Sequence, residues 1–203
     1  MPALSVRLVR HGESTANVGL PSPDFDSIAL TPRGQEQAMT LAASLLEPPD
    51  LLVISPLKRA IQTAEPIRAR WPHVACETWP IQEITYLSPQ RCAHTTSAQR
   101  RQWVQEYWER CDVDSLDGPD AESFAQFWTR VAHFHERAVS QRSGRLLVVG
   151  HGQFLHASLM YRPESAAATP DLMRRFRHTE VAHPLANACL VDMPLHINAP
   201  SGE

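Results

Sequence analysis

The 203-residue sequence lacks an apolar run near the roughly 20 residues that a membrane-spanning helix needs. With 19 basic residues against 22 acidic ones, it also lacks the excess of positive charge that nucleic-acid binding requires. No apolar block followed by a small-residue cleavage site opens the chain, since Arg7 and Arg10 interrupt the first apolar stretch. We therefore expect a cytoplasmic protein with neither a membrane nor a nucleic-acid partner.

The four cysteines are few and dispersed. They form no Cys-x-x-Cys pair and no dense framework, which indicates reduced thiols without a structural disulfide or metal role. Histidines number 10, yet no His-Glu-x-x-His occurs, and His133 and His135 are two residues apart, so they would not share a helix face. We expect no metal and no cofactor.

What the sequence does contain is typical of a globular protein, with 43% hydrophobic and 20% charged residues and no internal repeat. Its length favours a single domain spanning residues 1–203. Apolar runs predict strands at 4–9, 51–54, 74–76, 146–149 and 185–191. Helical spacing and capping residues predict helices from Thr31 to about Glu47, from Ser55 onward, over 120–141 and over 154–161, with Pro66 expected to kink or end the second.

Strands that alternate with helices favour an α/β fold, a three-layer α/β/α sandwich with a mainly parallel sheet. Residues 78–118 lose clear periodicity, so we expect them to form a cap-like insertion over the site. Ligands of open parallel sheets bind beyond the carboxyl ends of the strands. Three predicted strands end there in polar residues: Arg10-His11, Ser55 leading to Arg59, and His151. One crevice could collect them all.

Two histidines and two arginines in one crevice create a positive potential that suits a dianionic phosphoryl group. Neighbouring positive charge disfavours imidazolium, and a neutral imidazole nitrogen is a competent nucleophile, so His11 fits that role. Arg10, Arg59 and a protonated His151 would then hold the phosphoryl oxygens, where charge spreads in the transition state. This chemistry requires no metal.

Five linked motifs carry a resemblance to a known family. They are LVRHGESTAN at 8–17, Leu30-Thr31 with Gly34, Gln37 and Ala38, the segment 55–64 with Arg59, Glu122-Ser123, and VGHG at 149–152. In order and spacing these resemble the histidine phosphatase superfamily, the phosphoglycerate mutase-like proteins. The resemblance is continuous from residue 6 to about 65 and again near 120–155, while 84–118 and the tail match weakly.

The resemblance implies that His11 becomes phosphorylated, that Arg10, Arg59 and His151 complete the phosphate pocket, and that Asn17 donates to a phosphate oxygen. It also implies a glutamate after the third strand that protonates the leaving oxygen and later activates water. Glu83 is the candidate, although the glycine-rich sequence that often follows such a glutamate is replaced by YLSP at 86–89.

Three functions are compatible with these residues. We expect a phosphatase that hydrolyses phosphomonoesters through phosphohistidine, acting on a small phosphorylated substrate or a phosphoprotein. A phosphoglycerate-type mutase would use the same pocket but usually resembles a longer glutamate-centred signature, which is absent. A non-catalytic phosphate-binding protein need not retain the nucleophile. Glu13 and Thr63 are expected to be structural, and the aromatic residues of 79–108 fit a substrate cap or ordinary packing equally well.

Overall fold

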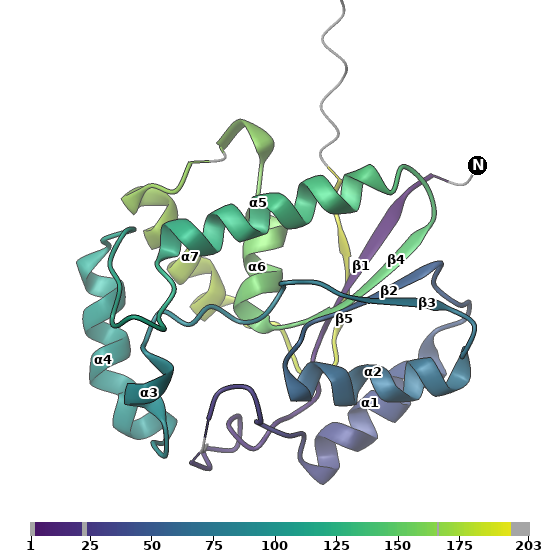
Figure 1. Ribbon diagram of the computed structural model, residues 1–203, viewed down its shortest axis with the longest axis horizontal. Coiled ribbons are helices and arrows are strands. Elements are labelled where there is room, and N and C mark those ends of the chain that lie inside the picture. The colour runs from purple at the N-terminus through teal and green to yellow at the C-terminus, as the bar shows by residue number, and fades with distance from the viewer. Residues whose placement is uncertain (1–2, 22–23, 166, 196–203) are drawn as a thin grey trace, which may run out of the picture.

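A computed structural model describes residues 3–21, 24–165 and 167–195, and its centre is a five-stranded sheet (Figure 1). The strands are β1 (Ser5–Arg10), β2 (Leu51–Ile54), β3 (Ala75–Thr78), β4 (Arg145–Gly150) and β5 (Leu190–Met193). Their order in the sheet is β3-β2-β4-β1-β5. Of the four strand pairs in this sheet, three are parallel, and the pair of β1 with β5 is antiparallel. The expected mainly parallel sheet is confirmed.

Helices lie on both faces of the sheet, which confirms the predicted α/β sandwich (Figure 1). One face is covered by α1 (Pro32–Ser44) and α2 (Lys58–Arg70), and the other by α5 (Phe124–Ser140) and α6 (Gly152–Met160). Three more helices, α3 (Pro89–Cys92), α4 (Ser97–Arg110) and α7 (Pro170–Ala182), lie beside the sheet, and a short 3-10 helix spans Pro163–Ser165. The single-domain organisation stays a prediction.

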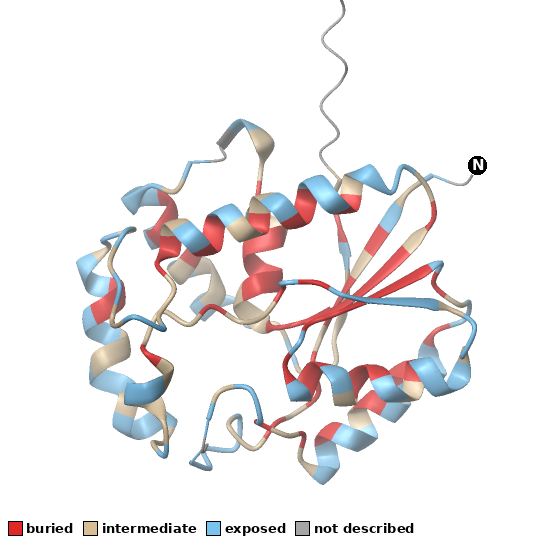
Figure 2. Ribbon diagram, in the orientation of Figure 1, coloured by how far each residue is buried: buried red, intermediate tan, exposed pale blue. Residues whose placement is uncertain are grey.

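Burial explains why these segments form strands. All four residues of β2 are buried, and five of the six in β4 are, as expected for parallel strands that are covered on both faces (Figure 2). Alternate side chains enter two separate apolar clusters: Val53 and Val148 pack on the side of α5, whereas Leu52 and Val149 pack against α1 and α2. The edge strand β3 is exposed throughout.

Several predicted boundaries are wrong. The first helix ends at Ser44 rather than Glu47, and the second begins at Lys58 rather than at Ser55. That second helix also continues through Pro66 to Arg70, because Ala60, Ala64 and Ile67 are anchored in the core on its inner face. Burial of this face outweighs the hydrogen bond that the proline cannot make.

The long helix begins at Phe124 instead of Asp120, where Ser123 and Gln126 form a capping box. The last strand covers 190–193 rather than 185–191. Residues 185–189 stay a loop because the Leu185 carbonyl accepts a hydrogen bond from Arg10, and Ala188 adopts a positive φ of 54°.

Candidate active site

The parallel arrangement brings three strand ends together. Because β4 lies between β1 and β2, their final residues are neighbours at one edge of the sheet. The ladders continue one step further: His11 N donates to Gly150 O at 2.9 Å, and Ser55 N donates to Val149 O at 3.0 Å. This places the rings of His11 and His151 with their centroids 5.1 Å apart.

His11 is buried, with 4% of its surface exposed, and its Nδ1 lies 2.7 Å from the carbonyl oxygen of Gly12. A carbonyl can only accept, so Nδ1 carries the proton and Nε2 keeps a free lone pair. Burial, followed by the charge of Arg59, lowers the pKa of His11 to about 3, although the bond to Gly12 opposes the shift. His11 is therefore a neutral imidazole with Nε2 available.

His151 is completely buried, and its Nε2 lies 2.7 Å from Ser55 Oγ. Its Nδ1 is buried without a hydrogen-bond partner among the described residues. Burial, and then the charge of Arg59, lowers the pKa of His151 well below 6.5. In the protein alone His151 is therefore neutral at neutral pH, and the protonated form that we expected requires the negative charge of a bound phosphoryl group.

The two arginines supply the positive charge of the site. Arg59 is 4% exposed and donates from Nη1 to the backbone oxygen of Phe25 at 3.1 Å. Its guanidinium carbon lies 5.0 Å from the centroid of the Phe25 ring. Burial lowers the pKa of Arg59 to about 10, which leaves it charged at neutral pH. Arg10 donates from Nη1 to Leu185 O, whereas its Nε is buried without a partner among the described residues. Both guanidinium groups thus retain donors for an anion.

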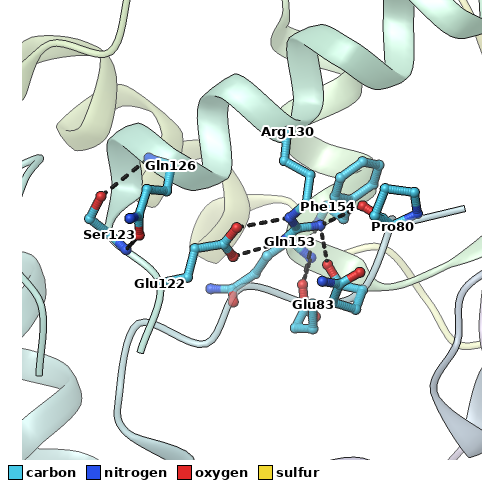
Figure 3. Close-up of polar contacts among 9 residues, drawn as sticks. Pro80, Glu83, Glu122, Ser123, Gln126, Arg130, Gln153 and Phe154 are labelled. Atoms are coloured by element: carbon cyan, nitrogen blue, oxygen red, sulfur yellow. Dashed lines mark hydrogen bonds and ion pairs between the residues drawn. The ribbon is translucent and has the colours of Figure 1, made fainter. Parts of the chain in front are cut away.

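Glu83 lies at the amino terminus of α6. Its Oε1 accepts hydrogen bonds from the backbone N–H groups of Gln153, at 3.0 Å, and Phe154, at 3.2 Å (Figure 3). Burial raises the pKa of Glu83 above 4.5, although Arg59 and these two N–H groups oppose the shift. A carboxyl group with a raised pKa beside the proposed nucleophile is suited to transferring a proton.

Asn17 is exposed at the rim, and its Oδ1 accepts from Ser14 N and Ser14 Oγ, both at 3.0 Å. Asn187 Nδ2 donates to the same oxygen at 3.2 Å and to His11 O at 3.0 Å. The Nδ2 group of Asn17 has no partner within the described part of the chain, so it is free to donate to a ligand. No sequence signal pointed to Asn187, which reaches the site from a loop about 170 residues away.

Two buried hydroxyls support the site. Ser55, predicted to start a helix, pairs with His151 and accepts a longer hydrogen bond from Leu57 N at 3.4 Å, while the helix itself begins at Lys58 without a side-chain cap from Leu57. Thr63 Oγ1 accepts from Gly12 N at 3.0 Å and donates to Arg59 O at 2.7 Å, so it joins the histidine loop to the arginine helix. The structural role expected for Thr63 is what its contacts show.

Close backbone packing holds the loop after β1 against the start of α1. A Cβ atom at Gly12 would lie 2.5 Å from Gly34 O, and one at Gly34 would lie 2.0 Å from Glu13 O. Glu13 itself accepts a hydrogen bond from Thr31 Oγ1 at 2.8 Å. Glycine is required at both positions, and Glu13 serves the packing of the loop.

A cavity of about 240 Å³ joins these groups to the insertion. Its lining includes Arg10, His11, Asn17, Arg59 and Glu83. His151 does not line it but lies directly behind His11. The structure thus brings all six predicted site residues together. Among the aromatic residues of the insertion, Tyr86 lines the cavity, whereas Trp79, Tyr107 and Trp108 are buried in the core.

This geometry defines a class of site: an uncharged histidine, two charged arginines and a carboxyl group of raised pKa line one cavity, and a second uncharged histidine packs against the first. The arginines supply donors suited to an oxyanion. In the part of the chain that the structure covers, no group of three or more His, Cys, Asp or Glu side chains is arranged to hold a metal ion. Nor do the described residues include a helix long and apolar enough to cross a bilayer.

The chain belongs to the histidine phosphatase superfamily (branch 1), whose family model matches residues 6–186. Among solved structures it is similar to a putative alpha-ribazole-5'-P phosphatase from Escherichia coli, with 26% identity and a TM-score of 0.70 over 94% of this chain and 90% of that one. It also resembles the phosphoserine phosphatase of Entamoeba histolytica, with 21% identity and a TM-score of 0.66 over 93% and 89% of the two chains; this match concerns the fold. No curated protein matches the chain significantly.

Proposed function

We propose that this protein is a metal-independent phosphatase that hydrolyses small phosphomonoesters in the cytoplasm. The observation that carries the proposal is the neutral His11, which keeps a free lone pair on Nε2 and lines the same cavity as Arg10, Arg59 and Glu83. Membership of the histidine phosphatase superfamily supports it. So does the similarity to the Escherichia coli protein, which is described as a putative phosphatase of alpha-ribazole-5'-phosphate.

The reaction proceeds in two steps. Nε2 of His11 attacks phosphorus and forms a P–N bond while the ester P–O bond breaks, and Glu83 delivers its proton to the leaving oxygen. The alcohol departs. Glu83, now a carboxylate, takes a proton from water, whose oxygen attacks the phosphoryl group and releases His11 and inorganic phosphate. Glu83 is thereby reprotonated.

The remaining groups hold the phosphoryl oxygens. Arg10 Nε, Arg59 and Asn17 Nδ2 are available donors, and His151 Nδ1 is a buried nitrogen that still lacks a partner among the described residues. Such preorganised donors usually supply the largest share of transition-state stabilisation. A bound dianion also favours the charged form of His151, which converts Nδ1 into a donor.

The test is turnover of nitrophenyl phosphate in EDTA by the wild type and by His11→Ala, combined with a rapid quench that detects acid-labile phosphoenzyme. We expect turnover and phosphoenzyme in the wild type and neither in the variant. Activity that survives in the variant would remove His11 as the nucleophile. With 3-phosphoglycerate as substrate, isomerisation faster than phosphate release would replace the phosphatase by a mutase, and phosphate binding without turnover of any ester would leave a binding protein.

A further inference from the structure

The insertion builds the part of the cavity that lies beyond the phosphate-binding groups. Apart from the backbone, its contribution to the lining is mostly apolar: Ile84, Tyr86, Leu87, Pro89, Ala93 and Val104. On the opposite side Phe25 and Ile28 continue this surface. Glu83, which directly precedes the lining residues 84–87, is shared by the phosphate-binding groups and the insertion, and the proposed mechanism places the oxygen of the leaving group beside it.

Charge is sparse at this end. Within residues 84–118, Arg100 is the one charged side chain that lines the cavity, and its Nη1 already donates to the Thr95 carbonyl at 3.1 Å and hydroxyl at 3.0 Å. Asp24, which also lines the cavity, contributes an opposite charge. A leaving group with a carboxylate or a second phosphate would therefore find little compensation there, whereas an apolar group would gain from leaving water.

Volume limits the substrate further. The cavity holds about 240 Å³, below the roughly 300–1,000 Å³ of sites for drug-sized ligands. We propose that the insertion forms a leaving-group subsite that selects small phosphomonoesters of apolar, ring-bearing alcohols over those of anionic or very short alcohols. This inference rests on the proposed phosphatase activity and assigns its substrate class.

The subsite is tested by kcat/KM for 2-phenylethyl phosphate, ethyl phosphate and 3-phosphoglycerate, whose leaving groups are all alkoxides and thus depend equally on an acid. We expect the phenylethyl ester to exceed the other two by at least about tenfold. Val104→Asn, which places a polar group on the apolar wall, should reduce that ratio several-fold. Gln105→Asn, on the exposed side of the same helix, should not.

Equal kcat/KM for the phenylethyl and ethyl esters, or a preference for 3-phosphoglycerate, would refute the subsite. These outcomes still include turnover through phosphohistidine, so they leave the phosphatase intact. Failure of the proposed activity has a different signature, namely no phosphoenzyme with any of the three esters.

A second inference concerns the segment that carries Glu83, which is neither helix nor strand. Arg130, on α5, donates from Nη1 to the carbonyl oxygens of Pro80, at 3.1 Å, and Gln82, at 2.8 Å (Figure 3). Its Nε and Nη2 donate to the two carboxylate oxygens of Glu122 at 2.8 and 2.6 Å. One side chain thus fixes the backbone just before Glu83.

Glu122 fixes the backbone on the other side, because its own N–H donates to Thr85 O at 2.9 Å. The pair is shielded, with 12% of the Arg130 side chain and 18% of the Glu122 side chain exposed. Two parallel hydrogen bonds give an arginine–carboxylate pair a defined geometry, and shielding preserves its strength. The guanidinium also lies 5.2 Å from the ring of Phe154, whose N–H binds Glu83.

We infer that Arg130 and Glu122 are positioning residues that hold Glu83 at the reacting oxygen. This inference depends on the proposed acid role of Glu83. It also gives a function to Glu122, which belongs to a motif that the chemistry of the phosphate pocket leaves unused.

The test compares two rates of phosphoenzyme formation, both measured by rapid quench: that from 2-phenylethyl phosphate, which needs an acid, and that from nitrophenyl phosphate, whose leaving group departs without one. Arg130→Lys and Glu122→Gln should each lower the rate of phosphoenzyme formation from the alkyl ester about 10- to 100-fold while changing that from nitrophenyl phosphate much less. Arg137→Gln is the control, because Arg137 lies on the same helix and pairs with Glu77 at 2.8 Å; it packs over the ring of Trp79 but, among the described contacts, donates no hydrogen bond to the backbone of residues 80–85. It should leave the ratio of the two rates unchanged.

A matched loss on both esters in either variant would refute the positioning role, since general damage to the fold slows both. Phosphoenzyme formation from nitrophenyl phosphate in each variant reports that the pocket is formed. The same ratio measured for Glu83→Gln separates the two hypotheses. If Glu83→Gln slows both esters equally, the acid role of Glu83 is wrong. If Glu83→Gln slows mainly the alkyl ester while Arg130→Lys and Glu122→Gln slow both equally, only the positioning role is refuted.

Discussion

Replacing Glu83 with glutamine would remove the transferable proton and little else. The backbone N–H groups of Gln153 and Phe154 donate to Oε1, and an amide oxygen in the same place can accept both bonds. The substitution also removes a carboxyl group whose charged form is disfavoured by burial. We therefore expect Glu83→Gln to fold and to bind phosphate normally, so that any loss of rate reports on proton transfer.

The size of that loss should depend on the ester. A positioned general acid contributes about 10²- to 10⁴-fold, and the whole of this factor applies when the leaving group is a basic alkoxide. The rate of phosphoenzyme formation from 2-phenylethyl phosphate in Glu83→Gln should therefore fall by about that factor. Nitrophenolate is stable as an anion, so nitrophenyl phosphate should retain most of its rate of phosphoenzyme formation, measured by rapid quench.

The pH profile gives an independent readout. Because burial raises the pKa of Glu83 above 4.5, its proton persists to higher pH than in an ordinary glutamate, and kcat/KM for the alkyl ester should decline as pH rises through that raised pKa. Glu83→Gln should lack this basic limb. Equal losses on the two esters, together with an unchanged basic limb, would refute the assignment of Glu83 as the acid.

Three further predictions concern the support of the site. Gly34→Ala should lower the free energy of unfolding by about 1–3 kcal/mol in urea titrations, because its Cβ would lie 2.0 Å from Glu13 O; exposed Gln35→Ala in the same helix should have little effect, and equal stabilities would contradict the close packing. Ser55→Ala should lower kcat about 10- to 100-fold, since His151 Nε2 loses the partner that orients the ring, and an unchanged kcat would exclude this role. Burial lowers the pKa of His151, so as pH falls the unfolded chain binds a proton at this histidine before the folded protein does, and the free energy of unfolding should decrease below pH 6.5. In His151→Gln the free energy of unfolding should decrease less steeply with falling pH. An equal decrease in both proteins would show that His151 does not contribute.

The sequence was most informative where function depends on strand ends. Arg10, His11 and His151 directly follow buried apolar runs, and parallel strands bring their carboxyl ends to one edge, so their convergence could be predicted without a structure. The same logic located Arg59 near the start of the helix after β2. Placing each of these residues required only the apolar runs that predict the strands and the parallel direction of those strands.

Other features depend on contacts that no local pattern records. Asn187 reaches His11 through a loop whose path is set by Arg10 and Leu185. The role of Ser55 was hidden because a serine before a proline also fits a helix cap, and only the position of His151 decides between the two. Helices α4 and α7 do carry capping signals at Thr96 and Thr169, but their apolar faces are completed by packing against one another and against the core.

The charge state of the site links these observations. Both histidines are neutral, so the arginines are its main positive groups, and their combined charge matches a phosphoryl dianion. An ionised Glu83 would cancel one of these charges before substrate arrives, and its raised pKa widens the pH range in which it does not. In the proposed mechanism Glu83 becomes negative only after it has protonated the leaving oxygen. That new charge weakens the positive potential at the moment when the site no longer needs it to bind substrate, and it makes the same carboxylate a base for the attacking water.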